Sequence, residues 1–167
     1  MEPLRTRRLV LLPLDADRAR RLAAGPSGPP GPSDRWAEGY PEAGDRAGAE
    51  RYLRVLADTG DPAPYGAFEI QRRSDGLMIG GAGFHGPADG AGRVTVGYGL
   101  VPAVRGQGYA AEALRALLEH ARAQGAVTVS GDTDRANTAS QHVMAAAGMH
   151  PVGEDARLLY YAVSWTR

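Results

Sequence analysis

The sequence predicts a single α/β domain spanning residues 1–167, in which one mixed sheet carries helices on both faces. Strand and helix patterns alternate along the whole chain, and 167 residues suffice for one hydrophobic core. The clearest segment begins with alternating apolar residues over Val94–Leu100, which is typical of a strand. A glycine turn and an amphipathic helix follow, and the helix ends at Gly125. Its apolar positions are Ala110, Ala113, Leu114, Leu117, Leu118 and Ala121.

The elements before this segment are predicted from periodicity and turn residues. A strand is expected over Arg7–Leu14, followed by a short helix that Asp15 caps and that ends near Ala24. Residues 25–35 are rich in proline and glycine, so they predict a loop within the domain. A helix is then expected over Glu50–Asp58. Two strands, Tyr65–Arg72 and Leu77–Phe84, form a hairpin whose Asp-Gly turn lies at residues 73–76.

Three more elements are expected after the long helix. They are a strand over Val127–Asp132, a helix over Asn137–Ala147 and a final strand over Leu158–Trp165. Gly148 ends the helix, and Pro151 acts as a further stop.

Composition excludes several classes of function. The 19 basic and 19 acidic side chains balance, which argues against binding to nucleic acid or a membrane surface. The absence of cysteine excludes disulfides, a thiolate nucleophile and thiolate metal sites, and we expect no metal. No segment resembles a signal peptide or a membrane span, so we expect a cytoplasmic protein.

The bend at Arg105–Ala110 is the strongest functional candidate. Gly106 and Gly108 let the backbone approach a ligand, and the first amides of the following helix suit a phosphate. An ordinary strand-to-helix turn explains these residues equally well. A Walker loop is excluded because the chain has no lysine, and a dinucleotide fingerprint fits poorly because Ala111 replaces its third glycine.

The pattern Arg-x-x-Gly-x-Ala at 105–110 follows Gly-Tyr-Gly-Leu-Val-Pro at 97–102. Together they closely resemble the acyl-coenzyme A loop of the GNAT acetyltransferase superfamily. More narrowly they resemble its RimJ/RimL group, whose members acetylate ribosomal-protein N-termini and other amines. Other segments match this group in the right order, namely Thr6–Leu11, Ile79–Phe84, Asp134–Ser140 and Ala147–Met149.

The resemblance implies a mostly antiparallel sheet of six to seven strands that splay at a V-shaped cleft. The cleft would lie between Val94–Leu100 and Val127–Asp132. It further implies an acyltransferase that moves an acetyl group from acetyl-CoA to a primary amine by direct attack. The acceptor would be a protein N-terminus or a small-molecule amine, with a homodimer compatible but not required. Trp36, Tyr40 and Pro41 would pack the preceding loop, with lining of the acceptor pocket as the alternative.

The resemblance also assigns residues to the cosubstrate. Backbone groups of Leu100 and Val101 would contact the pantetheine arm. Asn137 would hydrogen-bond the same arm, with Ser140 one turn further on the same face; Asn137 equally suits a helix N-cap. The pyrophosphate would be held by Arg105, Gly106, Gln107, Gly108, Tyr109 and Ala110.

The catalytic positions depart from the family pattern. Thr95 stands where many relatives have a glutamate base, and Met144 stands where they have a tyrosine, which leaves Ser140 as proton donor. The candidate bases, in order of preference, are Asp132, His85 and Glu69, and each is also explained as a polar surface group.

A site without a strong carboxylate base favours amines that lose their proton easily. At pH 7 an N-terminal amine costs about 1 kcal/mol to deprotonate, whereas lysine costs about 4–5 kcal/mol. We therefore expect an α-amine or a small amine of similar pKa as acceptor. The alternative is a non-catalytic acyl-CoA-binding or sensing module on the same fold.

Overall fold

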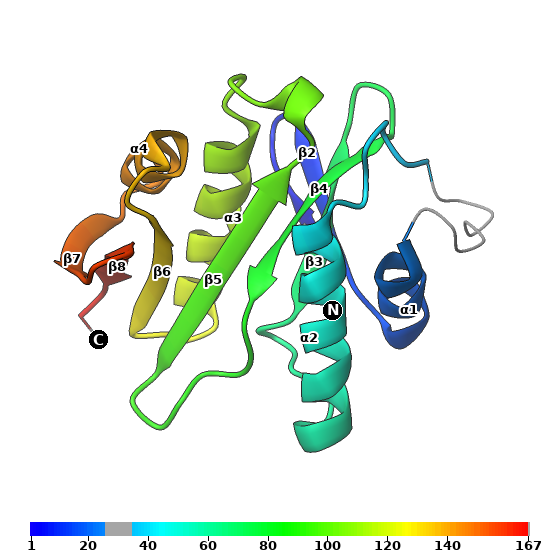
Figure 1. Ribbon diagram of the computed structural model, residues 1–167. Helices are drawn as coiled ribbons and strands as arrows, with labels where there is room; N and C mark the ends of the chain where they lie inside the picture. Colours follow the sequence, from blue (N-terminus) through cyan, green and yellow to red (C-terminus); the bar gives the residue numbers. More distant parts are fainter. Residues whose placement is uncertain (26–34, 167) are drawn as a thin grey trace.

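A computed structural model of the chain describes residues 1–25 and 35–166. In this part, eight strands form one sheet in the order β1-β2-β3-β4-β5-β6-β8-β7 (Figure 1). The strands are β1 (Leu4–Arg5), β2 (Leu9–Pro13), β3 (Ala67–Arg72), β4 (Met78–Phe84), β5 (Arg93–Leu100), β6 (Thr128–Asp134), β7 (His150–Glu154) and β8 (Leu158–Ser164). The helices are α1 (Ala16–Ala24), α2 (Ala43–Thr59), α3 (Tyr109–Ala123) and α4 (Thr138–Ala146), with a 3₁₀ turn η2 (Pro102–Val104). Apart from its two end residues, the predicted 25–35 loop lies outside the described residues.

Helices α1 and α2 cover one face of the sheet, and α3 and α4 cover the other (Figure 1). Successive side chains of a strand point to opposite faces, and β3 shows which helix covers which face. Its Glu69 carboxylate pairs with Arg18 of α1, whereas the neighbouring Phe68 ring packs edge-on against His120 of α3. No helix in the described part of the chain combines the length and apolar character needed to cross a bilayer.

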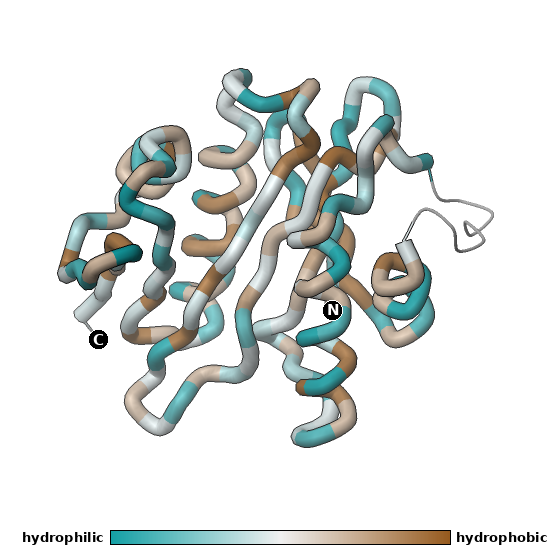
Figure 2. Tube along the Cα trace, in the orientation of Figure 1, coloured by the Kyte–Doolittle hydropathy of each residue, from teal (hydrophilic) through white to brown (hydrophobic). Residues whose placement is uncertain are grey.

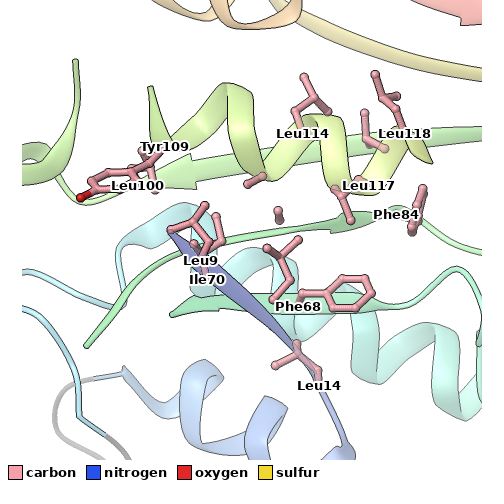
Figure 3. Packing of buried hydrophobic residues seen from close by; sticks show 14 of the residues in the cluster. Leu9, Leu14, Phe68, Ile70, Phe84, Leu100, Tyr109, Leu114, Leu117 and Leu118 are labelled. Atoms are coloured by element: carbon pink, nitrogen blue, oxygen red, sulfur yellow. The ribbon is translucent and has the colours of Figure 1, made fainter. Parts of the chain in front are cut away.

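The main core lies between α3 and the strands beneath it. Leu114 and Leu117 of α3 are fully buried above Leu9 and Ile70 of the sheet (Figure 3). Figure 2 shows apolar segments along the central strands and α3, and hydrophilic turns on the outer side of α1 and α2. The predicted amphipathic helix is therefore confirmed as the element that buries the α3 face of the sheet.

The sheet has eight strands, more than the six to seven predicted, because two strands carry weak sequence signals. β1 is only two residues long, and β7 contains Pro151 and Gly153. These two residues lie at an irregularity in the β7–β8 register, on an edge strand where proline removes no needed donor. Helix α2 also begins earlier than predicted, at Ala43, because a capping box between Glu42 and Asp45 starts it.

The predicted splay between two central strands is confirmed. β5 and β6 are parallel neighbours only from Arg93–Thr95 and Thr128–Ser130. Beyond these residues β5 stays paired with β4, and β6 stays paired with β8. The two strands therefore separate and leave a V-shaped opening in the sheet.

A polar network fixes the first turn of α3 against the amino-terminal strands. The Glu112 carboxylate accepts hydrogen bonds from the Thr6 hydroxyl, from the Arg8 amide at 2.9 Å and from Arg8 Nε at 2.8 Å. The Arg8 guanidinium also donates to the Gln107 carbonyl at 2.9 Å and lies 4.4 Å from the centre of the Tyr109 ring. These contacts attach the bend before α3 to the segment that contains Thr6 and Arg8.

Replacing Glu112 by Gln should lower the free energy of unfolding by about 1–3 kcal/mol at neutral pH. Burial alone would raise the pKa of Glu112, but hydrogen bonds from Thr6 and Arg8 outweigh it and lower this pKa. The stabilisation is therefore complete above the ordinary value of 4.5 and is lost as pH falls through the folded-state pKa.

Urea unfolding at about pH 7 and about pH 3 measures this effect, and the gap between wild type and Glu112→Gln should narrow at the lower pH. Exposed Glu119 on the same helix provides the control, since Glu119→Gln should change stability by less than about 0.5 kcal/mol. A gap of equal size at both pH values would contradict the ionic origin of the effect.

Candidate functional site

The bend between β5 and α3 is open to solvent. Residues 105–108 are exposed, and Gly106 and Gly108 adopt φ angles of 80° and 83°. The first hydrogen bond of the helix runs from the Glu112 amide to the Gly108 carbonyl, so the preceding amides have no partner within the helix. No atom lies within 4 Å of where a Cβ on Gly106 would be. The bend can therefore admit an anion to its amides.

The edge of β5 that faces the opening carries free backbone donors. The Val101 amide donates to Ile79 of β4 and the His85 amide donates to Thr95, so odd-numbered residues of β5 bond toward β4. By the alternation of an antiparallel ladder, the amides of Tyr98 and Leu100 point toward the opening. The Leu100 carbonyl accepts from Arg105 Nε at 2.9 Å.

Val101 differs from Leu100 in this respect. Its amide bonds to Ile79, and its carbonyl accepts from the Val104 amide at 3.2 Å. The side chain is buried at 1% exposure. Val101 therefore offers no free amide to a ligand, and the available donors shift to Tyr98 and Leu100.

Helix α4 supplies the other side of the opening. Asn137 is its N-cap, and Asn137 Oδ1 accepts from the Ser140 amide at 3.0 Å. Because the cap uses only the side-chain oxygen, the NH₂ group of Asn137 remains able to donate a hydrogen bond. The Ser140 hydroxyl lies 2.7 Å from the Tyr98 hydroxyl, which links α4 to β5 across the opening.

Tyr98 was not singled out from the sequence, although it lies within the Gly-Tyr-Gly pattern. Burial raises its pKa, and the hydrogen bond with Ser140 works in the opposite direction. The phenol is therefore protonated at neutral pH and can pass a hydrogen bond to Ser140. Met144 is buried behind Gly131.

The opposite face of the sheet contains a hollow of about 270 Å³ under α2. Glycines of β4 and β5 form its floor. His85 Nε2 lies 2.7 Å from where a Cβ on Gly97 would be, and Asp45 Oδ1 lies 2.8 Å from the equivalent point on Gly81. Side chains at these positions would displace both groups, so the glycines make room for an imidazole and a carboxylate above the sheet.

The candidate bases occupy different environments. Burial lowers the pKa of His85 and nearby Arg51 adds to this, while Asp132 raises it. Asp132 is exposed on β6, and its charge reaches His85 from across the opening. Thr95 lies at the closed end of the opening, where its hydroxyl is 3.3 Å from that of Ser130.

Glu69 is engaged in the core and not in the hollow. Its carboxylate accepts from Arg18 at 2.9 Å and from the Tyr40 hydroxyl at 2.8 Å, and the side chain is 1% exposed. Tyr40 is itself buried and packs edge-on against Trp36, with ring centres 5.8 Å apart. These aromatic residues pack the segment before α2, and Tyr40 also contributes to the wall of the hollow.

Asp45 is a site residue that sequence reasoning missed, because only the folded chain brings α2 above the glycines. Burial raises its pKa to about 6, and the Glu42 amide that donates to Asp45 Oδ2 at 2.9 Å works against this. Over the described residues, no group of three or more histidine, aspartate and glutamate side chains is placed to hold a metal ion.

The site thus joins four features around one opening in the sheet. An amide-rich bend lies at one end, and unpaired amides line the β5 edge. A hydroxyl pair lies on the α4 face, and titratable groups lie in the hollow on the α2 face. This arrangement can hold a phosphate-bearing chain through the sheet and bring its end toward a base.

Comparison with known proteins identifies the same architecture. Residues 8–150 match the family described as acetyltransferase (GNAT) domain. No curated protein matches the sequence.

Solved structures with this fold include an acetyltransferase from Agrobacterium tumefaciens, which is 25% identical and has a TM-score of 0.66, covering 99% of this chain and 95% of that one. A ribosomal-protein-alanine acetyltransferase from Vibrio fischeri is 12% identical with a TM-score of 0.68 and coverages of 98% and 97%. RimL, a ribosomal-protein acetyltransferase solved with coenzyme A, is 16% identical with a TM-score of 0.68 and covers 98% of each chain. These likenesses show that the chain shares its fold with solved acetyltransferases.

Replacing Asp45 by Asn should remove a pH-dependent loss of stability. A carboxyl with a raised pKa binds its proton more tightly in the folded state, so stability falls as pH rises from 3.8 to about 6 and is level above that. Because part of the side chain faces water, we expect wild type to lose about 1–2 kcal/mol relative to Asp45→Asn over this range.

Denaturant unfolding at about pH 4 and about pH 8 measures the difference. Asp58→Asn, at an exposed position of the same helix, serves as the control. If wild type and Asp45→Asn differ equally at both pH values, the Asp45 carboxyl is not the group responsible.

Proposed function

The chain belongs to the GNAT acetyltransferase family, and on that basis we propose a cytoplasmic enzyme that transfers an acetyl group from acetyl-CoA to a primary amine. The acceptor is a protein N-terminus or a small-molecule amine. The proposal is carried by one observation: the unpaired edge of β5 is continuous with the solvent-exposed bend that follows it a few residues later.

The bend holds the diphosphate of acetyl-CoA in this proposal. Amides from Gly106 to the first turn of α3 point outward at the positive end of a 15-residue helix, which favours negative charge. The pantetheine arm carries amide groups of its own, and these pair with the open amides of Tyr98 and Leu100. The Asn137 side-chain amide donates to the arm from α4.

The reaction forms a C–N bond and breaks the C–S bond of the thioester. The amine enters from the hollow and attacks the carbonyl carbon, and the developing oxyanion is stabilised by the amides along β5. The amine proton moves to a base on the α2 face. The departing sulfur takes a proton from Ser140, which regains one through its hydrogen bond with Tyr98, and water returns the proton to the phenol. Holding both reactants in one opening supplies much of the acceleration.

We assign His85 as the base, ahead of Asp132. The His85 ring lies directly over Gly97 of β5, whereas Asp132 is exposed on the far strand. A lowered pKa keeps the imidazole neutral at pH 7, so it can accept a proton, although as a weak base. A weak base favours acceptors of low pKa, so we propose α-amines and similar small amines over lysine side chains.

Replacing Gly108 by Ala should reduce affinity for coenzyme A by at least about tenfold. An alanine at the φ of 83° costs about 1–2 kcal/mol, and its methyl would lie 3.2 Å from Arg8 Nη2, so the backbone is strained and the Arg8 guanidinium must move. Calorimetric titration with coenzyme A measures the loss. Pantetheine, which has no diphosphate, should bind both proteins equally.

Gly125→Ala is the matched control, because Gly125 has a φ of 93° at the other end of the same helix. It should bear a similar conformational cost with no change in coenzyme A affinity. Unchanged coenzyme A binding by Gly108→Ala would remove the diphosphate from the bend.

Replacing His85 by Asn should lower kcat/KM by about 10²–10⁴-fold while coenzyme A affinity is retained. The assay is release of free thiol from acetyl-CoA with a panel of α-amines and lysine peptides. Expressed per unprotonated amine, the wild-type rate should decline only at pH values below 6.5, where His85 takes up its proton.

Asp132→Asn, assayed in parallel, should cost much less than His85→Asn. A larger loss in Asp132→Asn would assign the base to Asp132. Binding of acetyl-CoA without thiol release on any amine would favour the alternative of a non-catalytic acyl-CoA-binding module.

A further inference from the structure

Arg51 is a cation in the wall of the hollow that has no ion-pair partner among the described residues. It lies on α2, is half-buried and forms part of the wall of the hollow. Within residues 1–25 and 35–166, its guanidinium makes no ion pair or hydrogen bond. The acids of the same wall are engaged, since Glu42 pairs with Arg105 at 3.2 Å and Asp45 accepts from the Glu42 amide.

We propose that Arg51 binds an anionic group of the acceptor, so that the enzyme selects amines carrying a carboxylate close to the reacting nitrogen. This inference rests on the proposed acetyl transfer at the same site. The carboxylate belongs either to a free amino acid or to an acidic first residue of a peptide, and the two sources share the same chemistry.

The chemistry of the side chain supports this choice of ligand. A guanidinium presents a planar fork of donors that matches a carboxylate in two parallel hydrogen bonds. A half-buried guanidinium has lost part of its hydration, so a matching anion offsets that loss. An arginine that served only to solubilise the surface would point away from the hollow. Arg54 on the same helix is such a residue, because it is exposed and does not line the hollow, whereas Arg51 does.

Geometry limits how far the anion is from the amine. Arg51 and His85 line the same hollow, and the charge of Arg51 reaches the imidazole. The hollow of about 270 Å³ is at the small end of ligand sites, so it admits one amino-acid-sized group above Gly83 and Gly97. An acceptor with its amine at His85 and its carboxylate at Arg51 would therefore be about the size of a single amino acid.

Binding of such an acceptor also affects the base. The positive charge of Arg51 is one of the causes that lower the pKa of His85, after burial. A carboxylate on Arg51 neutralises this charge and makes the imidazole a stronger proton acceptor when the correct substrate is present. Arg51 thus acts as a specificity residue whose effect extends to the base.

The test compares matched pairs of acceptors in wild type and Arg51→Gln. One pair is L-alanine and L-alaninamide, and the other is two tripeptide amides that begin with aspartate or asparagine. Values of kcat/KM are expressed per unprotonated amine, because the members of a pair differ in amine pKa. Wild type should prefer the anionic member of at least one pair by about tenfold or more, and Arg51→Gln should abolish that preference.

Arg54→Gln should leave the preference unchanged. Calorimetry on the complex with coenzyme A measures binding of the same four compounds independently of transfer. Equal use of charged and neutral members by wild type, or a preference that survives in Arg51→Gln, overturns this inference while leaving acetyl transfer intact. Arg51-dependent binding of the anionic member without acetylation of any compound overturns the proposed reaction and supports the anion site.

Discussion

The early end of pairing between β5 and β6 is the constraint on which the rest of the site depends. After Thr95 and Ser130 the two strands hold to their outer neighbours, so backbone groups of β5 face a gap and not a strand. Backbone amides rarely stay without partners in proteins. A ligand with amides of its own is suited to such an edge, and the bend that follows Leu100 is suited to the phosphates at the far end of that ligand.

The two faces of the opening are organised by different means. On the α4 face, side chains meet directly, and the Ser140 and Tyr98 hydroxyls join a helix to a strand. On the α2 face, the lack of side chains on two glycines is what matters, because Gly81 and Gly97 leave the space that Asp45 and His85 occupy. In the proposed reaction, a proton is removed on one face and returned on the other, with the reacting carbon between them.

Much of the fold could be predicted because its signals are local. The hairpin turn, the Asp15 cap and the apolar stripe of α3 each lie within a few residues. The start of α2 was missed because Gly44 and Gly48 weaken a helical pattern that Asp45 and the capping box establish. Edge strand β7 was missed because its proline and glycine are tolerated only at an edge.

Less of the site could be predicted, for a physical reason. The bend is contiguous in sequence, so its open amides follow from two glycines and a helix start. The roles proposed for Asp45, Arg51 and Tyr98 depend on residues that are distant in sequence and come close only in the folded chain. The engagement of Glu69 by Arg18 and Tyr40 likewise depends on α1 and the segment before α2 meeting over β3.

The gap between β5 and β6 links the stability of the protein to the supply of the ligand that fills it. A coenzyme bound there, as proposed, would take the place of a strand, and a ligand that binds only the folded state adds stability by mass action, about 2.7 kcal/mol at a hundredfold excess over Kd. On the proposed assignment, metabolic supply of the acyl donor and survival of the folded enzyme rise and fall together. Depletion of that donor would then lower the amount of folded enzyme as well as its turnover.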